Sequence, residues 1–303
     1  MSRPPRLTAR DFDPEVLALF DQYVHGQIDR RGFLAGAARF AAGVSGAAGL
    51  LAALSPQFAA AQQVKPDDAR LKTSFVEFAS PDGYGSGRGY LARPAKARRP
   101  LPLVLVAHEN RGLNPHIEDI ARRLALAGFI AFAPDALFPL GGYPGDEDAA
   151  RALFQKLEPA KTRQDFLAAV RMLRAVEGGN GRLGVVGFCW GGGMANFLAT
   201  QLPDLAAAVP FYGAAPPAAE VAKIHAELLL VFADNDERIN AGWPDYETAL
   251  KASGAHYAVF RPSGTQHGFN NDTTPRYDAA AAKDAWSRML ALFERTLRPK
   301  PHR

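Results

Sequence analysis

Cysteine is almost absent from this sequence: Cys189 is the only one among 303 residues. A single cysteine excludes an internal disulfide and any zinc site built from several thiolates. Histidine is also sparse, with seven residues, and the pair His108-Glu109 is not followed by a second histidine at zinc-binding spacing, because Gly112 stands there. We therefore predict no metal site.

The sequence also lacks a concentrated charge of either sign. The formal net charge is +4 at pH 7 and the isoelectric point is about 9.2, but lysine and arginine are scattered and do not alternate with aromatic residues along one stripe. Nucleic-acid-binding surfaces usually show such clustering. With 48% hydrophobic and 22% charged residues, the composition is that of a globular protein. We expect no nucleic-acid partner.

No apolar run is long and clean enough to predict a stable membrane span. The most apolar stretch, residues 35–54, is interrupted by glycines and contains Arg39. It follows Arg30-Arg31-Gly32-Phe33-Leu34, which resembles the twin-arginine export motif, and precedes Ala59-Ala60-Ala61, a small-residue cleavage site. Residues 1–61 are therefore predicted to be an export signal.

This signal implies that Arg30 and Arg31 bind the twin-arginine export machinery and that the protein is periplasmic. The alternatives for the same stretch are a membrane anchor or a buried alanine-rich helix. Upstream, residues 14–24 carry apolar side chains at helical spacing, which predicts a short amphipathic helix.

Beyond a predicted linker at residues 62–71, residues 72–303 alternate short apolar runs with helical segments, and no internal repeat is evident. The apolar runs predict strands at residues 73–78, 89–92, 103–107, 129–133, 183–186, 206–211, 228–232 and 257–260. Helices are predicted at residues 115–127, 147–156, 161–176, 243–253 and 278–297, with another after the glycines that follow residue 186.

This alternation predicts a single α/β domain with a mainly parallel central sheet and helices on both faces. The first two strands are separated by a turn-rich segment, which predicts a hairpin at the sheet edge. In open α/β sheets, functional groups gather at the carboxyl ends of the strands.

The segment Gly187-Phe188-Cys189-Trp190-Gly191 joins a predicted strand to a predicted helix. It has the pattern of a nucleophile elbow, with sulfur in place of the more common serine oxygen. Side chains two residues before and after the nucleophile would collide in such a turn, so glycine is needed at both positions. The start of the following helix would favour the thiolate form of Cys189.

A cysteine nucleophile needs a base, and four histidines follow Cys189 in the chain. His225 and His256 precede strands, and His302 is in the C-terminal tail. His267 follows the last predicted strand and therefore lies at the carboxyl edge of the sheet, as Cys189 does. His267 is the predicted base.

The base in turn needs an acid to orient its ring. The strand at residues 228–232 is followed by Asp234 and Asp236. We take Asp236 as the predicted acid and Asp234 as the alternative, with the other carboxylate as a turn or capping residue.

Four motifs in the same order resemble those of the dienelactone hydrolase family of α/β-hydrolases. They are HEN at residues 108–110, GFCWGG at 187–192, DNDERI at 234–239 and HGF at 267–269. The resemblance extends over residues 72–297 and implies the α/β-hydrolase fold.

For the active site, the resemblance implies a triad of Cys189, Asp236 and His267, with Glu109 as a fourth member that contacts the resting thiol. The implied reaction is hydrolysis of an ester or lactone through an acyl-enzyme, with no metal or organic cofactor. A carboxylate at a strand end beside a thiol can take part in proton transfer.

The developing oxyanion would be held by two backbone N–H groups. One is that of Trp190, directly after the nucleophile, and the other is that of Asn110, in the loop after the first central strand.

One departure from the family concerns substrate binding. Where the family has an arginine that holds a substrate carboxylate, four residues after the triad histidine, this chain has Asn271. Arg111, next to the oxyanion loop, is a candidate replacement. Tyr212 and Phe269 are candidates for an aromatic pocket wall.

The sequence therefore predicts a periplasmic hydrolase of small esters or lactones. The alternative is an exported binding protein on an α/β-hydrolase scaffold that carries out no chemistry. A complete set of catalytic side chains favours the enzyme, because a binding protein has no physical need for it.

Overall fold

The computed structural model describes residues 7–41 and 46–298. The chain divides into two compact units, and each is described here by itself. The N-terminal unit comprises Met1–Gln62, Ala233–Asn235 and Pro262–Asp284. The sheet unit comprises Gln63–Phe232, Asp236–Arg261 and Ala285–Arg303. Parts of the predicted signal segment, residues 1–6 and 42–45, lie outside the described residues.

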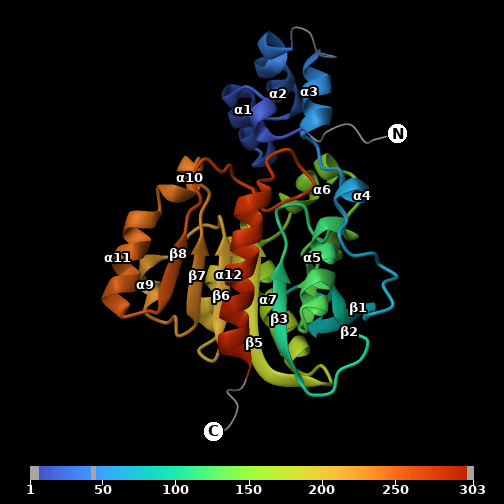
Figure 1. Cartoon of the computed structure of the whole chain (residues 1–303), viewed down its shortest axis with the longest axis vertical. Helices are drawn as coiled ribbons and strands as arrows, with labels where there is room; N and C mark the ends of the chain where they lie inside the picture. The colour runs from blue at the N-terminus through green and yellow to red at the C-terminus, as the bar shows by residue number, and fades with distance from the viewer. Residues whose placement is uncertain (1–6, 42–45, 299–303) are drawn as a thin grey trace. The chain divides into compact units, whose positions relative to one another are not determined.

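The sheet unit is built on a mainly parallel sheet whose described residues form eight strands, in the order β1-β2-β4-β3-β5-β6-β7-β8 (Figure 1). The strands are β1 Leu71–Ser80, β2 Gly85–Pro94, β3 Leu101–Ala107, β4 Ile130–Pro134, β5 Gly179–Phe188, β6 Ala207–Phe211, β7 Glu227–Val231 and β8 Tyr257–Phe260. β1 and β2 form an antiparallel hairpin at one edge, β2 pairs antiparallel with β4, and all other pairs are parallel. The predicted α/β class, parallel sheet and edge hairpin are confirmed.

The helices alternate with the strands as predicted. In the N-terminal part of the chain they are α1 Pro14–Val24, α2 Arg30–Ala37, α3 Gly46–Leu54 and α4 Phe58–Ala61. The later helices are α5 Pro115–Leu126, α6 Glu147–Phe154, α7 Pro159–Arg174, α8 Trp190–Gln201, α9 Ala218–Val221, α10 Glu237–Asn240, α11 Trp243–Ser253 and α12 Ala279–Leu297. Short 3₁₀ helices occur at Ala9–Asp11, Ala38–Phe40 and Phe138–Leu140.

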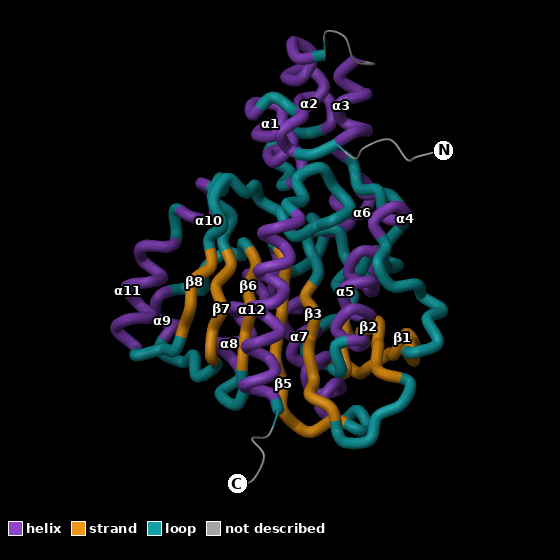
Figure 2. Tube along the Cα trace, viewed as in Figure 1, coloured by secondary structure: helices purple, strands orange, loops and turns teal. Residues whose placement is uncertain are grey.

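Both faces of the sheet are covered by helices, and α5 and α12 cross in front of the strands in Figure 2. On this face Phe293 of α12 packs near Gly184 of β5 and near Phe129. The opposite face forms one apolar core with α7, α8 and α11, to which Leu105 of β3 and Phe166 of α7 belong. Burial on both faces explains why β3 is an unbroken apolar run.

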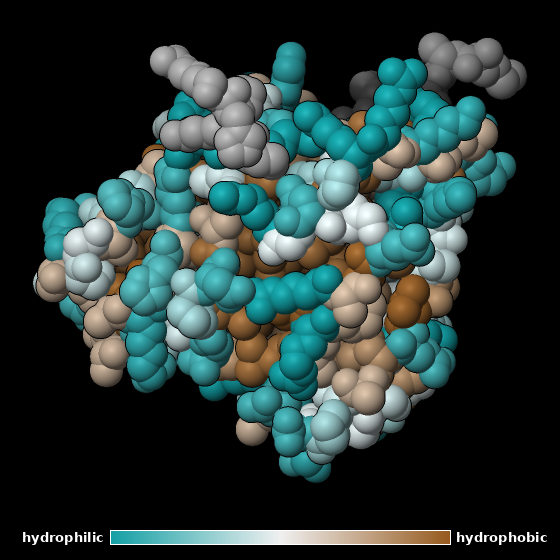
Figure 3. Space-filling view, turned by 90° about the horizontal axis from the view of Figure 1, so that it is seen from below, coloured by the Kyte–Doolittle hydropathy of each residue, from teal (hydrophilic) through white to brown (hydrophobic). Residues whose placement is uncertain are grey.

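The arrows of the parallel strands start at the lower edge of the sheet in Figure 1, and Figure 3 views the structure from below. Hydrophilic side chains occupy most of this face, with hydrophobic surface showing between them. Because functional groups of α/β sheets gather at the carboxyl ends of the strands, the candidate site is expected at the other end.

The helices α1, α2 and α3 of the N-terminal unit form an apolar core of their own. Phe33 is completely buried. The ring of Phe20 meets the Phe33 ring edge-on, and the ring of Tyr23 packs against it at a tilt. The predicted amphipathic helix at residues 14–24 is confirmed as α1, with Pro14 at its first position and Asp13 capping it. Within the described residues, no helix combines the length and the apolar character needed to cross a bilayer.

The chain enters the sheet unit through a segment that α5 holds by polar contacts. The Asp119 carboxylate accepts hydrogen bonds from the backbone N–H groups of Gln63 and Val64, at 3.1 and 2.8 Å. Arg122, almost completely buried, donates from Nε to the Val64 carbonyl and from Nη1 to the Tyr90 hydroxyl. The first residues of the predicted linker are therefore fixed to α5.

Candidate active site

Cys189 lies at the sharp turn between β5 and α8. Its backbone adopts φ 56° and ψ −114°, which a residue with a Cβ rarely adopts. The turn is held by a 3.0 Å hydrogen bond from the Cys189 N–H to the Phe211 carbonyl of β6. The predicted strained elbow between a strand and a helix is confirmed.

The two glycines of the elbow are required by close backbone approaches. A Cβ at position 187 would lie 1.8 Å from the Gly191 carbonyl oxygen, and a Cβ at position 191 would lie 2.2 Å from the Ala107 carbonyl oxygen. Real Cβ atoms never come this close to backbone oxygen. The prediction that both positions exclude a side chain is therefore confirmed.

The elbow places Cys189 at the start of α8. Trp190 is the first residue of the helix, and the first N–H groups of a helix have no partner within it. The N–H groups of Gly192 and Gly193 turn back to the Cys189 carbonyl. Cys189 is 9% exposed and lies at the positive end of the helix dipole, a position that stabilises negative charge.

His108, the first residue after β3, is completely buried, and the sequence analysis gave it no role. Its Nε2 accepts a hydrogen bond from the Ala136 N–H at 3.1 Å, so the ring proton of neutral His108 is on Nδ1, which lies 2.6 Å from the Glu109 carbonyl oxygen. Burial lowers the pKa of His108 to about 4. The ring stacks on Trp190, with centroids 5.3 Å apart and planes 16° apart.

His108 thus holds the loop that carries Glu109 and Asn110 against Trp190, the residue after Cys189. The only signal for it in the sequence is a histidine at the end of a fully buried strand. That pattern indicates a buried, neutral ring but does not reveal its partners.

Arg111 is 5% exposed and belongs to the same loop. Its Nη1 donates to the Asn110 carbonyl at 3.1 Å and to the Asn110 side-chain oxygen at 2.7 Å. Burial lowers the pKa of Arg111, whereas negative charge on Glu147, Cys189 and Glu109 acts in the opposite direction. The guanidinium therefore lies within electrostatic reach of both the predicted nucleophile and the predicted fourth catalytic residue.

Glu147, the first residue of α6, is a second site-lining acid that the sequence analysis did not identify. Its Oε2 lies 3.7 Å from Nε of Arg111, and its Oε1 accepts a 2.9 Å hydrogen bond from the Tyr143 hydroxyl. Burial raises the pKa of Glu147, although the charge of Arg111 opposes the effect. Glu147 therefore balances the charge of a buried arginine.

The two candidate acids differ in their surroundings. Asp236 is buried and caps α10, with Oδ1 3.4 Å from the Ile239 N–H. Asp234 accepts from the N–H of Gly264 at 3.0 Å and lies 3.5 Å from the Ser263 hydroxyl, so its carboxylate closes a turn. Each carboxylate therefore accepts a hydrogen bond from a nearby backbone N–H, and Asp236 is the more buried of the two.

His267 belongs to a loop of the N-terminal unit and is 4% exposed. The loop is held by a 2.9 Å hydrogen bond from the Asn235 N–H to the Thr265 carbonyl and turns at Gly268, which has φ 80°. Asn271 uses its side-chain oxygen to accept from the N–H and hydroxyl of Thr273, at 3.0 and 2.5 Å. Asn271 therefore has a structural role in the loop.

The remaining predicted residues are placed as follows. Phe269 and Tyr212 are completely buried, and Tyr212 has a positive φ of 36° directly after β6. Their roles in a pocket wall stay predictions. The predicted residues in the sheet unit are Cys189, Trp190, Glu109, Asn110, Arg111, Tyr212 and Asp236, whereas His267 and Phe269 belong to the N-terminal unit.

We examined the described residues of each unit separately for three His, Cys, Asp or Glu side chains close enough together to bind a metal ion. Among these described residues, no such group lies within a single unit.

The buried ring of His108 predicts a specific pH dependence of stability. Its pKa falls from 6.5 to about 4 on folding, so the unfolded chain binds the proton more tightly and stability is lost as the pH falls below about 6.5. The expected loss attributable to His108 between pH 7 and pH 5 is about 2 kcal/mol. Urea unfolding of the wild type and of His108→Gln at both pH values measures it.

The matched control is His256→Gln, because His256 lies in the connection before β8. The part of the pH dependence attributed to His108 should persist in this variant, because His108 is unchanged. Equal pH dependence in the wild type and in His108→Gln would contradict the prediction.

Comparison with known proteins identifies related sequences for both parts of the chain. Residues 88–297 match the dienelactone hydrolase family, and residues 4–42 match a separate family described as YqhI-like. A putative carboxymethylenebutenolidase of Escherichia coli K12 is 33% identical over 245 residues, which cover 76% of this chain and 89% of that protein. A putative hydrolase fragment, YghX, from the same organism is 51% identical over 106 residues, which cover 35% of this chain and 91% of the fragment.

Solved structures agree with the sequence relatives. The crystal structure of a putative dienelactone hydrolase from Klebsiella pneumoniae has a TM-score of 0.65 and 31% identity, covering 74% of this chain and 99% of that one. The structure of P91 is described as a dienelactone hydrolase-like promiscuous phosphotriesterase from metagenomic libraries. It has a TM-score of 0.65 and 24% identity, and the match covers 76% of this chain and 100% of P91. At this identity the match supports the fold alone. Because residues 88–297 match this family and the chain contains the elbow described above, the chain belongs to the dienelactone hydrolase family and has the α/β-hydrolase fold.

Proposed function

We propose that the protein hydrolyses small carboxylic esters or lactones through an acyl-enzyme on Cys189. The observation that carries this proposal is the backbone of the elbow, with Cys189 at φ 56° between two glycines that cannot be replaced. A strained turn raises the free energy of the folded state, and such strain is typical of active sites. A turn of this kind that places a thiol at a helix start suits a nucleophilic sulfur. The relatives named as carboxymethylenebutenolidases support the same class of reaction.

His267 is proposed as the general base and Asp236 as the acid that orients it. Asp236 follows β7 and His267 follows β8, and the chain leaves both strands at their carboxyl ends, as it leaves β5 at Cys189. Parallel strands bring these ends to one edge of a sheet. We take Asp236 as the acid because its carboxylate is buried, whereas Asp234 is only partly buried.

In the proposed reaction, His267 takes the thiol proton and the sulfur attacks the carbonyl carbon. The tetrahedral intermediate collapses by breaking the ester C–O bond, and the leaving alkoxide receives the proton from His267. Water, deprotonated by His267, then attacks the thioester carbon, and the C–S bond breaks to release the acid and the thiol. A lactone opens by the same steps, with the leaving hydroxyl still attached to the acyl group.

The oxyanion is proposed to accept hydrogen bonds from the backbone N–H groups of Trp190 and Asn110. Trp190 opens α8, and Asn110 lies in the loop fixed by His108. Glu109, next to Asn110, is proposed to exchange a proton with the resting thiol. Preorganised donors of this kind stabilise charge that develops in the transition state.

Arg111 is proposed to select substrates that carry a carboxylate. Arginine remains charged even where burial disfavours it, and here the charge lies near Cys189. Asn271, at the position of the family arginine, is committed to Thr273 and does not supply this charge. We therefore expect anionic esters or lactones to be better substrates than neutral ones of the same size.

Cys189→Ala is expected to lower kcat/KM for p-nitrophenyl acetate by at least about 10⁴-fold, because the proposed nucleophile and its covalent intermediate are lost. Thermal unfolding should show that the variant is folded. The assay is hydrolysis by the purified full-length protein, followed by release of p-nitrophenol. Undiminished turnover by Cys189→Ala would defeat the proposal.

A matched pair of variants tests the assignment of the acid. Asp236→Asn should lower kcat by roughly 10²-fold or more, because the histidine loses the group that orients its ring. Asp234→Asn should keep most of the activity and lose stability, because its carboxylate closes the turn at Gly264. The opposite result, with Asp234→Asn inactive and Asp236→Asn active, would reassign the acid.

We also propose export by the twin-arginine route. Arg30 and Arg31 are exposed at the start of α2, while Phe33 of the same motif is buried in the N-terminal core. Replacing both arginines by lysine should retain the protein in the cytoplasm of an export-competent bacterial host, whereas the control Arg10→Lys should not. Cell fractionation measures this, and an unchanged distribution of the double variant would exclude the route.

A further inference from the structure

A cluster of charged and polar groups in the N-terminal unit reaches His267 through the ring of His25. Asp21 lies in the last turn of α1 and His25 is the C-cap of this helix, with Nδ1 of His25 3.2 Å from Oδ2 of Asp21. The ring of His25 meets the ring of His267 edge-on, with centroids 4.7 Å apart and planes 82° apart. Arg276 completes the cluster, with Nη1 3.3 Å from Oδ1 of Asp21.

The Asp21 carboxylate is held in its ionised form. Burial, the largest single effect, raises the pKa of Asp21, but the hydrogen bond from His25 and the charges of His267, His25 and Arg276 together lower it well below its ordinary value. Electrostatic coupling between two groups is reciprocal. The electrostatic attraction between Asp21 and a positively charged His267 ring therefore acts on both groups.

We propose that Asp21 and His25 are positioning residues for His267, so that the N-terminal helices form part of the working enzyme. This inference rests on the role of His267 as the base in the proposed function. Asp21 and His25 act on the histidine ring and make no contact with substrate. Asp21 stabilises the charge that the ring acquires when it takes the thiol proton, and His25 packs against the ring edge.

Several features of the N-terminal unit fit this role. Arg276 also lies over the ring of Phe20, with its Cζ 5.1 Å from the centroid, so the same arginine links α1 to the loop after His267. The side chains of His25 and Arg276 are 11% and 9% exposed. Partly desolvated charges interact more strongly than exposed ones. The predicted signal segment thus contains groups that bear directly on the proposed base.

The test uses the full-length protein and the variant Asp21→Asn. Removing the negative charge leaves Arg276 and His25 beside His267, so the imidazolium form is disfavoured. The acid limb of the pH profile of kcat/KM for p-nitrophenyl acetate should move to lower pH by about one unit. NMR titration of the His267 ring, assigned with the variant His267→Gln, should show the same shift.

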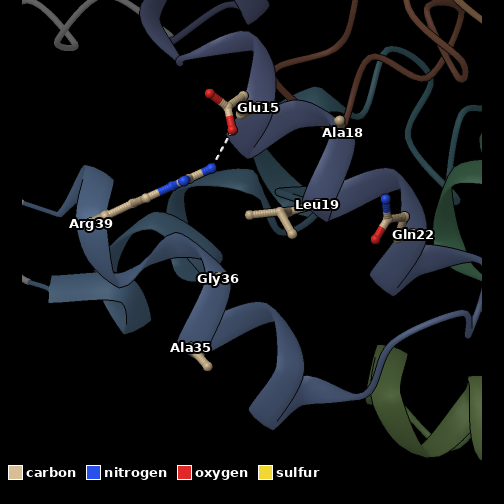
Figure 4. A pocket seen from close by; sticks show the side chains of 7 residues that line it. All are labelled: Glu15, Ala18, Leu19, Gln22, Ala35, Gly36 and Arg39. Carbon is tan, nitrogen blue, oxygen red and sulfur yellow. Dashed lines mark hydrogen bonds and ion pairs between the residues drawn. The ribbon is translucent and has the colours of Figure 1, made fainter.

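The matched control is Glu15→Gln on the same helix. Glu15 forms an ion pair with Arg39 across the pocket between α1 and α2 (Figure 4). The residues that line this pocket are Glu15, Ala18, Leu19, Gln22, Ala35, Gly36 and Arg39. Loss of this acid should change neither the pH profile nor the His267 titration.

A second variant acts in the opposite direction and decides the question if Asp21→Asn does not fold. Arg276→Gln removes a positive charge beside Asp21, so it should move the His267 titration to higher pH. A merely structural role for the cluster would lower stability without moving the titration in either variant. Superimposable titrations of the wild type and the folded variant would overturn the inference.

The outcomes separate this inference from the proposed function. If Cys189→Ala is inactive but the His267 titration does not respond to Asp21→Asn, the function stands and the inference fails. If Cys189→Ala is fully active, the function fails, whereas the NMR titration still measures the coupling of Asp21 to His267. Mass spectrometry of the intact active enzyme is a further test. If the active enzyme lacks residues 1–61, it lacks Asp21 and His25, and the inference is overturned.

Discussion

The approach of two backbone segments at the elbow is the constraint on which the site depends. The carbonyl of Gly191 occupies the space of a side chain at position 187, and the carbonyl of Ala107 occupies that of a side chain at position 191. This contact brings the end of β3 against the start of α8. It therefore sets the distance between the sulfur of Cys189 and the loop that begins at His108.

Much of the fold could be predicted because each buried element leaves a local pattern. The predicted strand at residues 257–260 and helix at 243–253 coincide with β8 and α11. β5 is longer than predicted, Gly179–Phe188, because its first residues are partly exposed and glycine-rich, with no apolar signal. One-turn helices such as α10 are too short for any periodicity to be visible.

The elbow at Cys189 and its glycines were predictable because a steric requirement acts between residues close in sequence. The partners of His108 were not, since Ala136 is 28 positions away and reaches the ring only through the packing of β3 beside β4. The cluster of Asp21, His25 and Arg276 joins residues 255 positions apart. The resemblance of this segment to an export motif rests on its arginines and gives no indication of such contacts.

The isolation of the sulfur has a consequence for redox chemistry. Oxidation would convert the Cys189 thiolate to a sulfenic acid, and the chain holds no second cysteine that could resolve it as a disulfide. At 9% exposure the sulfur is also closed to bulky reductants. Recovery of an oxidised molecule therefore depends on an external thiol small enough to reach a buried side chain.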